Sequence, residues 1–106
     1  MKIKHGIFKL QLRKGVLMGN NSNETCNVYF SSHAVRKTIS KDDDEFIGTY
    51  HDTWSGNNNQ LQQATLEISK YAYIDIYTLV WENNKVIYRG VAQKEGDTLY
   101  GTYTSA

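Results

Sequence analysis

Residues 76–103 read IYTLVWENNKVIYRGVAQKEGDTLYGTY, and this stretch decides the fold. It is rich in tyrosine, isoleucine, valine and threonine, which favour extended backbone. Two turn signals interrupt it, Asn83-Asn84 and the segment at residues 94–97. Asparagine tolerates the positive φ that both central residues of a two-residue type I′ hairpin loop require. The stretch therefore predicts three consecutive antiparallel strands, a β-meander.

The two turns also predict which residues of neighbouring strands face each other. With Asn83-Asn84 as the loop, Glu82 lies opposite Lys85, so that unlike charges meet at the end of the hairpin. The turn at residues 94–97 places Gly90 beside Gly101. Because successive side chains of a strand point to opposite sides, this pairing sorts the meander into two faces.

One face is predominantly aromatic, and we predict that it forms a ligand-binding surface together with a tryptophan from the predicted strand over residues 46–54. Large rings supply contact area, and their polar groups orient a ligand. The two glycines on this face let rings lie across the backbone or let a ligand approach it. The same rings can equally form a packed core, and the sequence leaves both interpretations open. The predicted binding residues are Trp54, Asp75, Tyr77, Trp81, Tyr88 and Tyr103.

The titratable residues near this face do not form a recognisable set of catalytic residues. Asp75 lies at its edge, where a carboxylate can fix the polar end of a ligand, although the rim of a barrel would leave it hydrated. His51 and Asp52 are adjacent, and a histidine beside a carboxylate is typical of a general base. Adjacent strand residues point to opposite faces, so we interpret this pair as a solvent-exposed strand end and predict no catalytic residues.

The opposite face of the meander is apolar as well. A monomeric sheet with a wet outer surface would not expose such a contiguous patch. We expect it to be covered either by residues 1–40 or by a second subunit, which makes a homo-oligomer a predicted partner. The patch consists of Ile76, Val80, Ile87, Val91 and Tyr100.

The rest of the chain continues the β pattern. Proline is absent, and clusters of glycine, asparagine and aspartate recur at intervals typical of an antiparallel β protein. Residues 20–23 and the acidic run 41–45 are predicted loops. Strands are predicted over residues 3–12, 16–19, 25–32, 46–54, 61–69 and 71–81, with a less regular one over 33–40.

The chain contains four short glycine-aromatic motifs: Phe46-Ile47-Gly48-Thr49-Tyr50, Trp54-Ser55-Gly56, Tyr88-Arg89-Gly90 and Leu99-Tyr100-Gly101-Thr102-Tyr103. Together they resemble the calycin group of small antiparallel barrels, which includes lipocalins and avidins. The resemblance covers residues 46–104, and residues 1–45 contribute no motif to it. It implies a meander that closes into a barrel of about eight or nine strands, whose interior binds a small apolar molecule. A β-sandwich, or an open sheet completed by a dimer partner, is the alternative fold.

Composition limits the remaining possibilities. The 106 residues fit one all-β domain, residues 1–106, and the net charge of +1 provides no field that attracts nucleic acid or an anionic membrane. Cys26 is the single cysteine, so an internal disulfide is excluded and a reducing, cytoplasmic location is expected. No stretch approaches the ~20 apolar residues of a membrane span. His5, His33 and His51 are too scattered for a metal site, and no cofactor motif is present.

These observations predict a non-catalytic protein that binds a small apolar or aromatic molecule inside a β-barrel. The first alternative is an interaction module that uses the apolar outer face of the sheet for oligomerisation or for docking on another protein. A further alternative is a barrel enzyme, which requires Asp75 or His51 to reach into the interior.

Overall fold

The computed structural model describes residues 5–23, 26–36, 46–55, 61–71, 74–85 and 87–105. These residues form eight β-strands and no helix. The strands are β1 (His5–Arg13), β2 (Val16–Asn23), β3 (Cys26–Arg36), β4 (Gly48–Ser55), β5 (Leu61–Lys70), β6 (Ile76–Glu82), β7 (Ile87–Glu95) and β8 (Thr98–Ser105).

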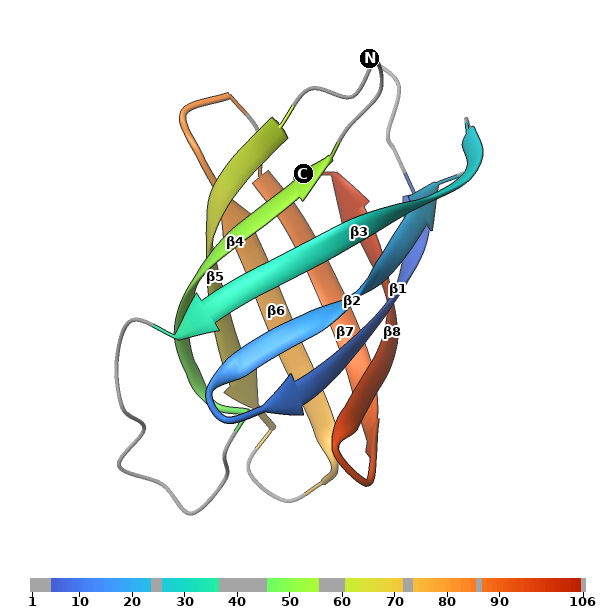
Figure 1. Ribbon diagram of the computed structural model, residues 1–106. Helices are drawn as coiled ribbons and strands as arrows, with labels where there is room; N and C mark the ends of the chain where they lie inside the picture. Colours follow the sequence, from blue (N-terminus) through green and yellow to red (C-terminus); the bar gives the residue numbers. More distant parts are fainter. Residues whose placement is uncertain are drawn as a thin grey trace.

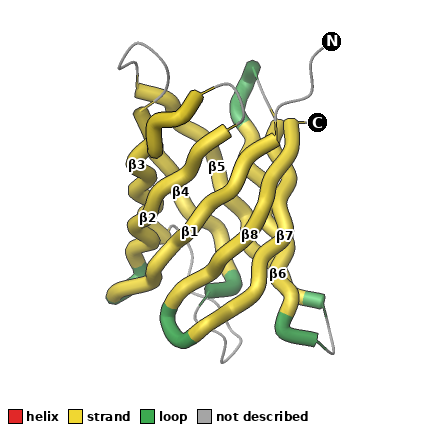
Figure 2. Tube along the Cα trace, turned by 90° about the vertical axis from the view of Figure 1, so that its right-hand side faces the viewer, coloured by secondary structure: helices red, strands yellow, loops and turns green. Residues whose placement is uncertain are grey.

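Each strand pairs antiparallel with the next one along the chain, and β1 also pairs with β8. The sheet therefore closes into a barrel, as Figures 1 and 2 show from two sides. The predicted antiparallel barrel is confirmed with eight strands, and the sandwich or open sheet is not formed. We call the end at which β1 begins and β8 ends the upper end, and the end with the β1–β2 and β7–β8 turns the lower end (Figure 1).

The meander is confirmed, but both of its predicted registers are wrong by two residues. Glu82 pairs with Ile87 instead of Lys85, so the β6–β7 connection is longer than the predicted two-residue loop. The Oδ1 atom of Asn83 accepts a hydrogen bond from the backbone N–H of Lys85 at 2.7 Å, and its Nδ2 donates to the carbonyl of Gln63 at 2.8 Å. Asn83 therefore turns the chain with its side chain and ties the turn to β5.

The second hairpin shows the same displacement. Gly101 pairs with Ala92 instead of Gly90, and the turn is made by Gly96 and Asp97, with Gly96 at a φ of 62°. A displacement of two residues preserves the alternation of side chains, because the period of a strand is two. The predicted faces of the meander are therefore confirmed, although the predicted partners are not.

Two other boundaries differ from the predictions. Residues 20–23, predicted as loop, extend β2, because they pair with β1 from Asn20 opposite Lys9 to Asn23 opposite Gly6. Ladder pairing outweighs the weak intrinsic strand preference of asparagine. The strand predicted over 71–81 begins only at Ile76. The predicted loop at 41–45 lies outside the described residues, and the less regular strand at 33–40 is described only to Arg36, as the end of β3.

The interior of the barrel is packed with apolar side chains from the described parts of all strands. Phe46, just before β4, is 2% exposed and lies at the lower end, where its backbone carbonyl accepts a hydrogen bond from the hydroxyl of Tyr50 at 2.9 Å. The buried apolar residues are Phe8, Leu10, Leu12, Leu17, Ala34, Phe46, Tyr50, Ala64, Leu66, Ile68, Tyr77, Leu79, Trp81, Ala92 and Leu99.

Asp97 joins the β7–β8 turn to β1 at the lower end. Its backbone carbonyl accepts a bond from the N–H of Leu12 at 2.8 Å, and its carboxylate accepts one from Gln11 Nε2 at 3.0 Å and one from Thr98 Oγ1 at 3.0 Å. These side-chain hydrogen bonds, that of Gln11 first, hold the pKa of Asp97 below its ordinary value of 3.8. The ionised carboxylate therefore supports closure of the barrel.

This arrangement predicts an acid-dependent contribution to stability. Because the pKa of Asp97 is lower in the folded state, its contribution is present above the unfolded-state pKa and is lost as pH falls through the folded-state pKa. We expect the stability difference between the native protein and Asp97→Asn to shrink from pH 7 to about pH 3. Urea unfolding of both proteins at each pH measures this difference in the free energy of unfolding. Gln11→Ala should reproduce part of the effect, and a difference that does not change with pH would contradict the assignment.

Candidate functional site

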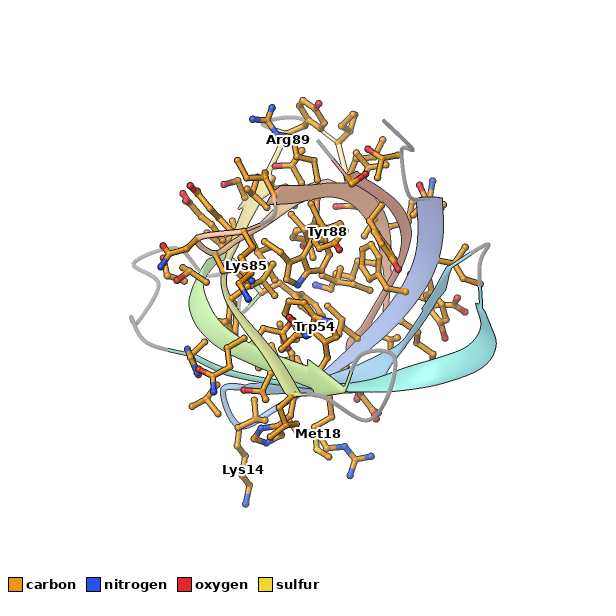
Figure 3. All side chains as sticks on the ribbon, turned by 90° about the horizontal axis from the view of Figure 1, so that it is seen from above. Lys14, Met18, Trp54, Lys85, Tyr88 and Arg89 are labelled. Carbon is orange, nitrogen blue, oxygen red and sulfur yellow. The ribbon has the colours of Figure 1, made fainter. Side chains whose placement is uncertain are left out.

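Four of the predicted binding residues lie at the upper end of the barrel interior, and we call them the upper site: Trp54, Trp81, Tyr88 and Tyr103. Their strands are β4, β6, β7 and β8. Trp81 is buried, whereas the other three are half-buried and pack against the core. Seen from above, Trp54 and Tyr88 are both directed into the barrel (Figure 3).

The rings of β6, β7 and β8 form a continuous cluster. The ring centroids of Trp81 and Tyr103 are 6.1 Å apart, and those of Tyr88 and Tyr103 are 5.7 Å apart, both pairs in edge-to-face geometry. The ring of Phe8 continues the cluster downward, 5.3 Å from Trp81. Such contacts hold each ring in a defined orientation. The upper site therefore has fixed aromatic walls.

The glycines of this face provide the space for these rings. A Cβ atom at Gly90 would lie 3.1 Å from Phe8 Cε1 and 3.1 Å from Trp81 Cζ3. At Gly101 it would lie 2.7 Å from Phe8 Cζ. The ring of Phe8 therefore lies across both glycines, which is one of the two uses that the sequence predicts for them.

The other two predicted binding residues do not join the upper site. Tyr77 is fully buried, and its ring packs 5.6 Å from that of Phe46, so it belongs to the packed core of the lower half. Asp75 precedes β6 at the lower end, where its side chain is 84% exposed and lies 3.3 Å from the ammonium of Lys70. An ion pair at such an exposed position contributes little to stability.

A different carboxylate, Asp52 of β4, lies inside the barrel. It is 1% exposed, and its Oδ2 atom accepts a hydrogen bond from Nε1 of Trp81 at 2.8 Å. The prediction of a solvent-exposed strand end is therefore wrong. The alternation of β4 could have located this residue, because Asp52 shares its face with Tyr50 and Trp54. Aspartate is polar, so it interrupts the apolar alternation by which an inward face is usually recognised.

A buried carboxylate is unusual enough to need a reason. Removing an ionised group from water is costly unless hydrogen bonds or opposite charges replace the lost hydration. The hydrogen bond from Trp81 connects this carboxylate directly to the rings of the upper site. A buried polar group beside a cluster of aromatic rings is a common feature of ligand sites.

His51 lies on the outside of the barrel, on the opposite face of β4 from Asp52. It borders a surface hollow of about 390 Å³ that is also lined by Gln63, Thr65, Glu82 and Asn83. The sheet separates the imidazole from the carboxylate of Asp52, so they cannot act as an acid–base pair. His51 and Asp75, the two residues on which the barrel-enzyme alternative depends, both lie outside the interior.

The predicted apolar patch lies on the outer surface of β6, β7 and β8. Val91 and Tyr100 are 48% and 43% exposed, and Ile7 of β1 extends the patch with 52% exposure. The described part of residues 1–40 builds β1, β2 and β3 of the barrel wall, so this part of the segment does not cover the patch. A second subunit as its cover stays a prediction.

Neither the remaining features of the described residues nor similarity to known proteins assigns a function to the upper site. Within the described ranges, no three His, Cys, Asp or Glu side chains gather as a metal site would require. The same residues include no helix of the length and apolarity needed to span a membrane. No protein-family model, curated protein or solved structure matches the chain. The likeness to calycins therefore stays a resemblance in a few short motifs.

Proposed function

We propose that the protein binds a small apolar or aromatic molecule, without catalysis, at the upper end of the barrel interior. The observation that carries the proposal is the contrast between the two halves of that interior. Toward the lower end, Tyr77, Leu79 and Leu99 are fully buried. Toward the upper end, inward-facing Trp54, Tyr88 and Tyr103 keep part of their surface accessible.

Exposed aromatic surface inside a barrel favours a ligand over bulk water. Covering apolar surface is worth roughly 25 cal/mol per Å², so a ligand that covers part of three rings gains useful affinity from contact alone. The edge-to-face packing of Tyr88 on Tyr103 keeps the surface in place before a ligand arrives. A preformed surface of this kind reduces the entropy lost on binding.

Binding of the neutral dye N-phenyl-1-naphthylamine tests this function, because its fluorescence rises in an apolar site. We expect saturable binding to the native protein and an affinity about tenfold lower for Tyr88→Ala, the loss of one aromatic contact. Tyr100→Ala is the matched control, since Tyr100 is an aromatic residue on the outer surface. Absence of dye binding, or equal losses in both variants, would contradict the proposal. Circular dichroism establishes that both variants fold.

A further inference from the structure

The outer faces of β6, β7 and β8 carry apolar side chains that are accessible on the surface of the barrel. We infer that two copies of this chain associate through these faces, with the two-fold axis of the dimer passing through Val91. Val91 and Tyr100 are 48% and 43% exposed, so both are open to contact. The inference goes beyond the proposed ligand binding and does not depend on it, because the patch lies on the outside of the barrel wall.

The register around Val91 suits a two-fold axis. Tyr100 pairs with Gln93, so it lies one strand from Val91 on the β8 side and one outward-facing position toward the lower end. Val80 pairs with Arg89, so it lies one strand away on the β6 side and one such position toward the upper end. In a two-fold dimer both copies use the same patch, and each contact occurs twice. A rotation about Val91 therefore brings Tyr100 of each copy onto Val80 of the other.

These contacts join apolar surface to apolar surface. Val91 meets its own counterpart at the axis, and Tyr100 covers Val80 on both sides of the axis. Thr78 and Thr102 flank Val91 in the ladder, and the rotation brings them together as well. Covering apolar surface in this way contributes roughly 25 cal/mol per Å² removed from water. The centre of the face therefore supplies the hydrophobic part of a symmetric interface.

Charged side chains at the margins of the same face are complementary under the same rotation. Lys9 of β1 pairs with Tyr100, and Glu67 of β5 pairs with Val80, so the two lie two strands from the axis in opposite directions. The ammonium of Lys9 lies 5.6 Å from the centre of the Tyr100 ring, so this side chain extends along the patch. The rotation brings Lys9 of each copy to Glu67 of the other. Both side chains are long, which suits the gap that widens as the two barrels curve apart.

The charges also favour this axis over one at the neighbouring strand. With the axis at Thr102 of β8, Lys9 would lie against Arg89 of the second copy, and like charges would meet twice. Arg89 is directed away from the barrel, so it would take part in that contact (Figure 3). With the axis at Val91, Arg89 lies instead over Gln93, whose amide oxygen can accept a hydrogen bond from the guanidinium.

Sedimentation velocity over a range of protein concentrations tests whether the patch joins two copies. We expect the native protein to reach twice the mass of one chain, and Val91→Arg, which brings two positive charges together at the axis, to stay monomeric at the same concentrations. Val35→Arg is the matched control and should dimerise as the native protein does, because Val35 is 45% exposed on β3. A native protein that is monomeric up to about 1 mM would leave the patch to a different partner and overturn the inference. Unchanged dimerisation of Val91→Arg would also overturn it.

Charge reversal tests the orientation of the two copies. Lys9→Glu and Glu67→Lys each place like charges at both symmetric contacts, and we expect either to raise the dissociation constant of the dimer about tenfold. An equimolar mixture of the two variants should restore the native dissociation constant, because both contacts of the mixed dimer again join unlike charges. Both residues are exposed, and circular dichroism establishes that the variants fold. A mixture that associates no better than either variant alone would overturn the proposed dimer.

Discussion

Gly101→Ala is expected to lower the free energy of unfolding by about 3 kcal/mol, the upper end of the usual range for overpacking. A Cβ atom at this position would lie 2.1 Å from the backbone oxygen of Val91 and 2.9 Å from the Cα of Ala92. Both atoms belong to the backbone of β7, which cannot rotate away as a side chain can. Strand β8 would therefore have to separate from β7.

Urea unfolding followed by circular dichroism measures this effect. Thr102→Ala is the matched control, because residue 102 is the next residue of β8 and faces the solvent. Surface substitutions of this kind usually change stability by less than about 0.5 kcal/mol. Equal stability of Gly101→Ala and the native protein would show that β7 and β8 tolerate a wider separation than the structure gives them.

Trp81→Phe is expected to reduce stability by about 2–3 kcal/mol, mainly because Asp52 loses the indole donor while it stays buried. Phenylalanine retains an apolar ring for the contacts with Phe8 and Tyr103, so the lost hydrogen bond is the larger part of the change. Urea unfolding of the variant and of the native protein measures this difference in the free energy of unfolding.

A double-mutant cycle separates this hydrogen bond from the change of ring size. In an Asp52→Asn background the residue left without the indole is a neutral amide, whose burial costs less than that of a carboxylate. Trp81→Phe should therefore cost clearly less there than in the native background. The same cost in both backgrounds would mean that the 2.8 Å contact between Trp81 and Asp52 carries no stability of its own.

The faces of the meander were predictable because they depend only on the alternation of side chains. Trp81 and Tyr88 both point into the barrel, as predicted. The structure pairs these two residues with each other, which a two-residue loop at Asn83-Asn84 would not do. The loop itself was not predictable from residue type alone. Asparagine suits a tight hairpin, but Asn83 uses its side chain to bond Lys85 and Gln63, which requires the position of β5.

The candidate site was predictable in its aromatic part and not in its carboxylate. Trp54, Trp81, Tyr88 and Tyr103 follow from alternation within strands that were correctly recognised. Asp75 was placed with them because the strand was predicted to begin at residue 71, whereas β6 begins at Ile76. The prediction of a solvent-exposed strand end fails at Asp52, because the alternation of β4 turns this residue inward, where carboxylates are rarely found.

Among the described residues, the buried side chains of the lower half form a floor that closes the barrel interior at that end. Phe46 lies at that floor, and the hydroxyl of Tyr50 bonds its backbone carbonyl. A ligand bound at Trp54 and Tyr88, as proposed above, would therefore enter and leave through the upper end. The time for which the ligand stays bound would then depend on its contacts with those two rings.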